Sequence, residues 1–156
     1  VVFIGDSITD CGRRDTSPPF GNGYVKMAID LIVSKYPERK ITFYNKGISG
    51  NMIEDLWNRW HDDVLTLKPD WVSVKIGIND LHRTLNNSAN GIPPAKFRKL
   101  YYDILSQTKD KLHANLVLID PFYISSDSHS DNFRREVLKL LPGYIKVVHE
   151  LADEFK

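Results

Sequence analysis

Four short apolar runs alternate with longer helix-period segments along the chain, and this alternation limits the possible folds more than any other feature. The runs are rich in Val, Ile, Leu and aromatic residues, and they cover Val1–Gly5, Ile41–Asn45, Trp71–Ile76 and Asn115–Asp120. Because they are apolar at successive positions, they are predicted to be strands buried on both faces, as in a parallel sheet. The helix-period segments are Gly23–Tyr36, Asn51–Leu67, Pro94–Leu112 and a last one from about Asp131 to Phe155.

Strand and helix alternation of this kind predicts an α/β fold, with a parallel sheet, helices on both of its faces and right-handed crossovers. A chain of 156 residues suffices for one domain and is too short for two ordinary ones, so residues 1–156 are predicted to form a single domain. Pro142-Gly143 interrupts the last helical segment, which is therefore either one kinked helix or two helices in line. Ligands of such sheets bind at the carboxyl ends of the strands.

The composition excludes several classes of protein. The formal net charge is +1 without a long basic run, so neither nucleic acid nor an anionic membrane is an implied partner. No apolar stretch approaches the roughly 20 residues of a membrane span. The single cysteine, Cys11, excludes an internal disulfide framework and a multi-cysteine metal cluster. With one thiol and no visible export signal, a cytoplasmic location is favoured, although the strand-like start of the chain suggests that preceding residues have been removed.

Three polar motifs follow the first three predicted strands. They are Gly5-Asp6-Ser7, Asn45-Lys46-Gly47-Ile48-Ser49-Gly50 and Gly77-Ile78-Asn79-Asp80. Because the carboxyl ends of parallel strands share one edge, we expect these motifs to converge. Ser7 offers a nucleophilic hydroxyl, while its own N–H, the N–H groups of the Gly50 turn and the Asn79 amide offer hydrogen-bond donors. A hydroxyl surrounded by donors suits acyl transfer, in which an oxyanion develops on the attacked carbonyl.

These motifs resemble the first three motif blocks of the SGNH (GDSL-like) hydrolase superfamily. The longer strings FIGDSITDCG, NKGISGN, KPDWVSVKIGIND and DPFYI resemble the bacterial branch that contains acetylxylan esterases and related carbohydrate deacetylases. The resemblance implies a three-layer, flavodoxin-like fold with strand order 2-1-3-4-5. It also implies Ser7 as the nucleophile and an oxyanion hole formed by the N–H groups of Ser7 and Gly50 and the side chain of Asn79.

The function implied by this resemblance is hydrolysis of carboxylic esters, in particular deacetylation of a carbohydrate or another small ester through an acyl-Ser7 intermediate. It needs no metal or other cofactor. The expected partner is the ester substrate, and a homo-oligomer of the chain is left open.

The catalytic base of the family is not found in this sequence. The base is a His that follows an Asp by three residues, after a fifth strand, and we expect all of these beyond Lys156. The chain alone is then predicted to be weakly active or inactive, with the edge of its fourth strand exposed. The string Asp110-Lys111-Leu112-His113 has the right spacing, but it precedes the fourth strand. It is therefore predicted to be solvated surface at the wrong edge of the sheet.

Two alternative functions remain open from the sequence. One is an aspartate-dependent phosphatase with Asp6 as its nucleophile; that chemistry needs a second Asp two residues later, where this chain has Ile8. The other is a catalytically inactive carbohydrate-binding or scaffold protein of the same fold.

For several further residues, a structural role is favoured over a functional one. His82 and His129 are predicted to be ordinary surface histidines, with contact to a substrate as the alternative. Trp57 and Trp60 are predicted to pack in a core or an interface, and Arg13 and Arg14 could border the cleft.

Overall fold

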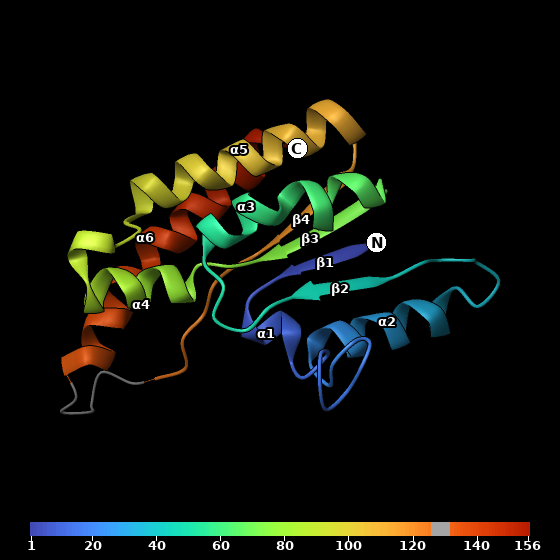
Figure 1. Ribbon diagram of the computed structural model, residues 1–156, viewed down its shortest axis with the longest axis horizontal. Helices are drawn as coiled ribbons and strands as arrows, with labels where there is room; N and C mark the ends of the chain where they lie inside the picture. The colour runs from blue at the N-terminus through green and yellow to red at the C-terminus, as the bar shows by residue number, and fades with distance from the viewer. Residues whose placement is uncertain (126–131) are drawn as a thin grey trace.

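The computed structural model describes residues 1–125 and 132–156 of the chain (Figure 1). Four parallel strands form one sheet in the order β2-β1-β3-β4. They are β1 (Val2–Gly5), β2 (Tyr44–Gly47), β3 (Trp71–Lys75) and β4 (Asn115–Ile119). This arrangement confirms the predicted α/β class and the predicted order of the first four strands.

The helices follow the strands as expected, with two additions, the short helix Ser7–Asp10 and the helix Ile78–Asn86. They are α1 (Ser7–Asp10), α2 (Tyr24–Lys35), α3 (Ile53–Asp63), α4 (Ile78–Asn86), α5 (Pro94–Leu112) and α6 (Asn132–Glu154), with 3₁₀ turns at Leu65–Leu67 and Ser88–Asn90. α4 was not predicted, because its nine residues include few apolar ones; Ile78 and Leu81 are buried. α6 is a single helix with Pro142 inside it, which decides against two separate helices.

β2 begins three residues later than predicted and ends two residues later. Its pairing partner sets these limits, because β1 and β2 are aligned from Val2 opposite Tyr44 to Gly5 opposite Gly47. The strand can include the polar residues Asn45 and Lys46 because both side chains find partners, in nearby carbonyl groups and in Asp63 respectively.

The two faces of the sheet are covered unequally. Figure 1 shows α3 and α5 on one side of the strands and α2 on the other. The main core joins one face of the sheet to helices α3–α6, and its largest fully buried side chains include Trp60, Phe97, Tyr101 and Tyr144. On the other face, a small cluster consists of Phe3 with Val25 and Ile29 of α2. The domain therefore rests on one large core and one small one.

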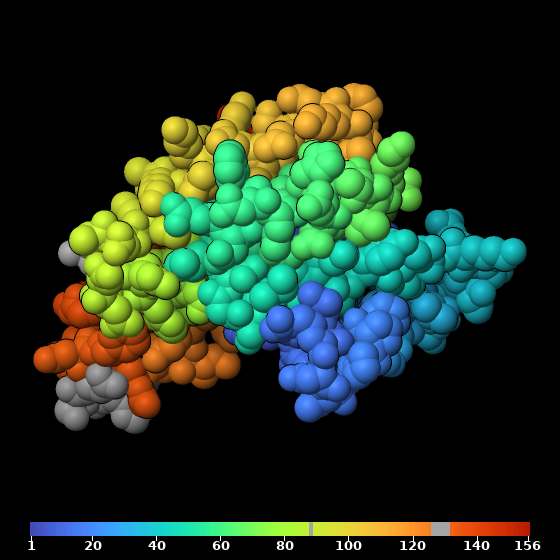
Figure 2. All heavy atoms as spheres, viewed as in Figure 1, coloured from blue at the N-terminus to red at the C-terminus, as the bar shows by residue number. Residues whose placement is uncertain are grey.

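A wide groove runs along the thinly covered face, beside α2. Its volume is about 1150 Å³, and its lining includes Tyr24, Tyr36, Trp71 and Val117. Trp71 and Val117 are 48% and 42% exposed. Among the described residues β4 pairs with β3 alone, so the far edge of β4 is open in this chain, as expected from the sequence. In Figure 2 the side chains of α3 and α5 form a continuous surface, whereas the blue lobe around α2 stands apart from the orange segment after β4.

None of the helices in the described ranges combines the length and the apolar character that crossing a bilayer would require.

The buried amide of Asn45 ties β2 to the segments that precede α2. Its Nδ2 donates to the carbonyl oxygens of Thr9 (2.7 Å) and Phe20 (2.8 Å), and its Oδ1 accepts from the N–H of Gly47 (2.9 Å). The residue is only 5% exposed, so these backbone groups cannot turn to water if the amide is removed. This side chain thus holds α1 and the following loop against the sheet.

Replacing Asn45 with Ala is expected to lower the free energy of unfolding by about 2–4 kcal/mol, because up to three hydrogen bonds are lost and buried carbonyls are left unpaired. Urea denaturation followed by circular dichroism measures this change. Asn58→Ala, at an exposed position of α3, is the matched control and should stay within about 0.5 kcal/mol of the wild type. Equal effects of the two substitutions would contradict the proposed bracing role.

A buried carboxylate joins the first turns of α3 and α4. Oδ1 of Asp80 accepts a hydrogen bond from the N–H of Ile53 (2.9 Å), while Oδ2 has no partner among the described residues. Burial raises the pKa of Asp80 from 3.8 to about 7, and the hydrogen bond from Ile53 offsets only part of this rise. Between about pH 4 and pH 7 the folded protein therefore holds a proton on Asp80 that the unfolded chain releases.

Because the folded pKa lies above the unfolded one, Asp80 stabilises the fold below about pH 4, and this contribution is lost as the pH rises to about 7. Asp80→Asn cannot titrate, so the wild type is expected to lose stability relative to this variant across that window, by at most about 4 kcal/mol. Urea denaturation at several pH values between 4 and 8 measures the difference. The exposed Asp62→Asn serves as control, and parallel pH profiles for wild type and Asp80→Asn would refute the assignment.

Candidate active site

The register of the sheet brings three strand ends level with one another. Gly5 of β1 is paired with Gly47 of β2 on one side and with Lys75 of β3 on the other. Ser7, Gly50 and Asn79 follow these residues at distances of two, three and four positions. All three predicted site residues therefore leave the sheet at its carboxyl edge, from adjacent strands.

Ser7 is exposed at the first position of α1. Asp6 caps this short helix, and its Oδ1 accepts a hydrogen bond from the N–H of Ile8 (3.0 Å). Neither the hydroxyl nor the backbone N–H of Ser7 bonds to any described residue. Both groups are thus available to an incoming ligand.

The turn that carries Gly50 is hydrogen-bonded to both sides of the segment that carries Ser7. The N–H of Ile48 donates to the carbonyl of Gly5 (3.0 Å), and the N–H of Ser49 donates to Oδ2 of Asp10 (3.1 Å). Gly50 itself has a φ of +83°, in open space, so glycine is needed there for its backbone conformation rather than for lack of room. Its N–H donates to no residue in the described part of the chain.

Asn79 connects α4 to the same turn. Its Nδ2 donates to the carbonyl of Asn51, the residue after Gly50, over 3.0 Å. A carboxamide nitrogen carries two hydrogens, so one N–H of Asn79 remains for another acceptor. The structure thus brings Asn79 beside the Gly50 turn, as the sequence motifs predicted.

Two buried charges lie beneath this surface. Asp6 is fully buried and Lys75 is 3% exposed, with its Nζ 4.4 Å from the centre of the Phe122 ring. Burial raises the pKa of Asp6, although the Ile8 N–H and the charge of Lys75 oppose this. Burial also lowers the pKa of Lys75, against the attraction of Asp6 and Asp120. Asp6 is enclosed while Ser7 is exposed, so the hydroxyl and not the carboxylate is open to an incoming molecule, which argues against the phosphatase alternative.

Other residues singled out from the sequence have mostly structural contacts. Arg13 donates to the carbonyl of Gly47 (2.6 Å), and Arg14 pairs with Asp10, so both arginines hold loops. Trp60 is buried and donates to Thr108 (2.9 Å), as predicted for a core residue, whereas Trp57 is 46% exposed.

The histidines differ from one another in environment. His82 is not an ordinary surface residue: its ring packs against Tyr123 and Phe133, with centroids 5.7 and 5.4 Å away, and burial lowers its pKa. His129 lies outside the described residues.

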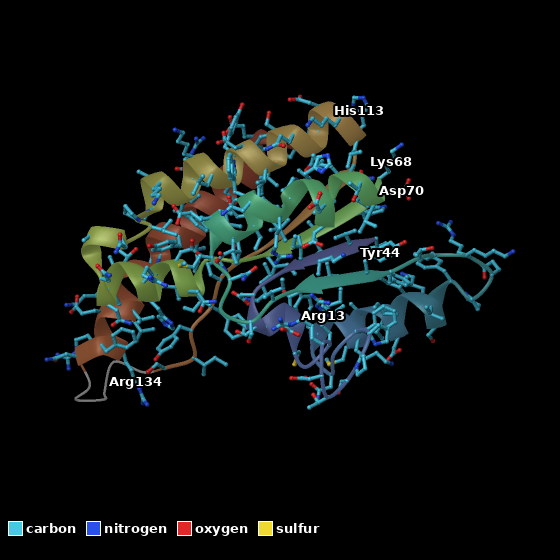
Figure 3. All side chains as sticks on the ribbon, viewed as in Figure 1. Arg13, Tyr44, Lys68, Asp70, His113 and Arg134 are labelled. Atoms are coloured by element: carbon cyan, nitrogen blue, oxygen red, sulfur yellow. The ribbon has the colours of Figure 1, made fainter. Side chains whose placement is uncertain are left out.

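The Asp110–His113 string lies at the opposite edge of the sheet. Figure 3 shows His113 at the same end as Lys68 and Asp70, which precede β3, and away from Arg13. Asp110 and His113 are both exposed at the end of α5. The prediction that this string is surface, and not a catalytic pair, is confirmed.

Sequence reasoning missed Asp10, whose carboxylate supports the Gly50 turn through Ser49. Asp10 and Arg14 are four residues apart and suggest an ordinary helix-surface ion pair, so only the fold reveals that the Asp10 side chain is 7% exposed. Within residues 1–125 and 132–156, no three His, Cys, Asp or Glu side chains are grouped so as to hold a metal ion.

Comparison with known proteins agrees with this geometry. Residues 3–155 match the model of the GDSL-like Lipase/Acylhydrolase family. The chain is 39% identical to an acetylxylan esterase of Geobacillus stearothermophilus, over 99% of this chain and 71% of that protein.

Solved structures show the same relationship. The crystal structure of that acetylxylan esterase, Axe2, matches with a TM-score of 0.82 at 36% identity, covering 99% of this chain and 71% of Axe2. Three further Axe2 structures are of catalytic mutants in which a serine, an aspartate or a histidine is changed to alanine. A putative GDSL-like lipase from Parabacteroides merdae matches with a TM-score of 0.87 at 32% identity, covering 99% of this chain and 72% of the lipase. With its sheet order, its exposed serine at the first strand end and these matches, the chain belongs to the GDSL-like lipase/acylhydrolase family of ester hydrolases.

Proposed function

We propose that this protein removes acetyl groups from a carbohydrate, such as an acetylated xylo-oligosaccharide, through an acyl-Ser7 intermediate. The observation that carries the proposal is a set of polar groups at the three strand ends that bond to no described residue: the Ser7 hydroxyl, the N–H groups of Ser7 and Gly50, and the second N–H of Asn79. The kind of ester is inferred from the relative that is named an acetylxylan esterase.

The chemistry follows from these groups. The Ser7 hydroxyl attacks the carbonyl carbon of the ester, and negative charge develops on the carbonyl oxygen. The three N–H donors stabilise this oxyanion more than they stabilise the neutral ester, and this difference lowers the barrier. The sugar hydroxyl leaves, and water then releases acetate from the acylated Ser7.

The attack also requires a base that accepts the proton of Ser7. The hydroxyl bonds to no described residue, and His82 is enclosed by aromatic rings. The Axe2 catalytic mutants include an aspartate and a histidine besides the serine. We therefore propose that the base is a His oriented by an Asp, which accepts the proton of Ser7 and later returns it to the leaving group.

In the full-length protein, Ser7→Ala is expected to lower the rate of acetate release by about 10⁴-fold or more, since no acyl intermediate can form. The substrates are acetylated xylo-oligosaccharides and p-nitrophenyl acetate. Ser106→Ala, on the distant helix α5, is the control and should retain full activity. Turnover by Ser7→Ala within tenfold of the wild type would rule out the proposed nucleophile.

Asn79→Ala is expected to lower kcat by about 10²–10³-fold with little change in KM, because the amide acts on the oxyanion and not on the bound ester. Steady-state kinetics on the same substrates separate the two constants. Asn86→Ala, an exposed position on the same helix, provides the matched control. A raised KM with unchanged kcat would instead assign Asn79 to substrate binding.

A further inference from the structure

One guanidinium group contacts two strand ends and the residue next to Gly50. Arg59, on α3, donates from Nη2 to the carbonyl of Gly5 (3.2 Å), from Nη1 to the carbonyl of Lys46 (2.9 Å) and from Nε to Oδ1 of Asn51 (2.9 Å). Gly5 ends β1, Lys46 belongs to β2, and Asn51 follows Gly50. The rigid guanidinium of Arg59 therefore links β1 and β2 to the turn that precedes α3.

The position of this guanidinium is itself fixed by charge. Nη1 of Arg59 lies 2.6 Å from Oδ2 of Asp63, and Oδ1 of Asp63 lies 2.9 Å from Nζ of Lys46. The three side chains are between 17% and 28% exposed. Burial tends to raise the pKa of Asp63, but hydrogen bonds from Lys46 and Arg59 outweigh it and lower this pKa. Asp63 thus stays ionised at neutral pH and anchors Arg59.

Each candidate catalytic residue is connected to Arg59 by a short path. Ser7 lies two residues after Gly5, whose carbonyl accepts from Arg59. Gly50 directly precedes Asn51, whose side chain accepts from Arg59. Asn79 donates to the backbone carbonyl of the same Asn51. A displacement of the guanidinium would therefore be transmitted to the nucleophile and to both of the other oxyanion donors.

We infer that Arg59 is a positioning residue for ester hydrolysis, which sets the relative placement of Ser7, the Gly50 N–H and the Asn79 amide without touching the substrate. This inference rests on the proposed function. Lysine cannot replace arginine here, because one ammonium group cannot reach three acceptors that lie in three directions around a planar fork. Small errors in the placement of catalytic groups are costly, since a shift of about 1 Å can lower a rate by about 10²-fold.

The chain provides a matched arginine that lacks these contacts. Arg98, on α5, pairs with Glu154 (2.8 Å) and Glu150 (3.7 Å), and all three side chains are more than 40% exposed. Neither of these ion pairs involves the strand ends or the Gly50 turn. Substitution of Arg98 therefore controls for the loss of an arginine and its ion pairs.

The test compares Arg59→Lys, Arg59→Gln and Arg59→Ala with Arg98→Gln, all in the full-length protein. We expect each Arg59 variant to lose about 10- to 100-fold in kcat on p-nitrophenyl acetate, with KM within about threefold of the wild type. Arg98→Gln should stay within about twofold in both constants. Each rate is divided by the fraction of folded protein, which circular dichroism measures at the assay temperature.

Chemical rescue separates positioning from a general loss of stability. Millimolar guanidinium chloride should restore several-fold of the lost kcat in Arg59→Ala, whereas sodium chloride at the same ionic strength should not. Arg59→Lys retains a cation beside Asp63, so it provides the kinetic test if the smaller variants fail to fold.

Two results would overturn the inference: kcat of folded Arg59→Lys equal to that of Arg98→Gln, or an Arg59→Ala variant that folds and does not respond to guanidinium. Ser7→Ala, assayed in parallel, distinguishes this failure from that of the proposed function. If Ser7→Ala stays active, the proposed nucleophile is wrong; if it is inactive while the Arg59 variants match the control, only the role of Arg59 is wrong.

Discussion

The alignment of β1 with its two neighbours is the constraint on which the site depends. Gly5 is level with Gly47 and Lys75, so the segments after these residues start from the same edge although about seventy positions separate the first from the third. The hydrogen bonds of a parallel ladder fix this alignment, and a slip of one residue would turn every side chain of a strand to the opposite face. The large core, with Val2, Ile4, Val72 and Val74 on one face, makes such a slip costly. The placement of the polar site is therefore decided by apolar packing below it.

Close backbone approach and buried polar groups complete what the sheet begins. Gly47 lies against the backbone of Thr9 and Asp10 and leaves no room for a Cβ atom, so only glycine lets α1 approach β2 this closely. Asn45, Asp10 and Asp80 then hold loops and helix starts through hydrogen bonds to backbone N–H or carbonyl groups. A buried polar atom without a hydrogen-bond partner is costly, and one oxygen each of Asp10 and Asp80 has no partner among the described residues. These costly groups lie next to the backbone segments that carry the candidate site residues.

The strand order and the polar residues at the carboxyl edge of the sheet could be predicted from the sequence. The side chains that hold these residues in place could not. β1, β3 and β4 are apolar in sequence, and Ser7, Gly50 and Asn79 follow strands, so periodicity and motif position predict them. β2 was misplaced because the apolar residues Ile41 and Phe43 suggest an earlier start, and because Lys46 looks like a loop residue until its partner Asp63 is known. Arg59 and Asp63 have the spacing of an ordinary exposed helix pair. In each case the decisive contact joins residues 13 to 54 positions apart, or depends on burial, and neither is visible in a local pattern.

The unequal covering of the sheet has a consequence for the dynamics of the site. α1 is hydrogen-bonded to α2 through Thr9 and Tyr24 (3.1 Å), and α2 is held by the small cluster around Phe3. Local opening requires little free energy where few apolar side chains are buried, so amide hydrogen exchange is faster in such regions. Asn79 instead belongs to α4, which is packed on the large core. Ser7, the proposed nucleophile, thus belongs to the side of the domain with the smaller apolar core, and Asn79 belongs to the side with the larger one.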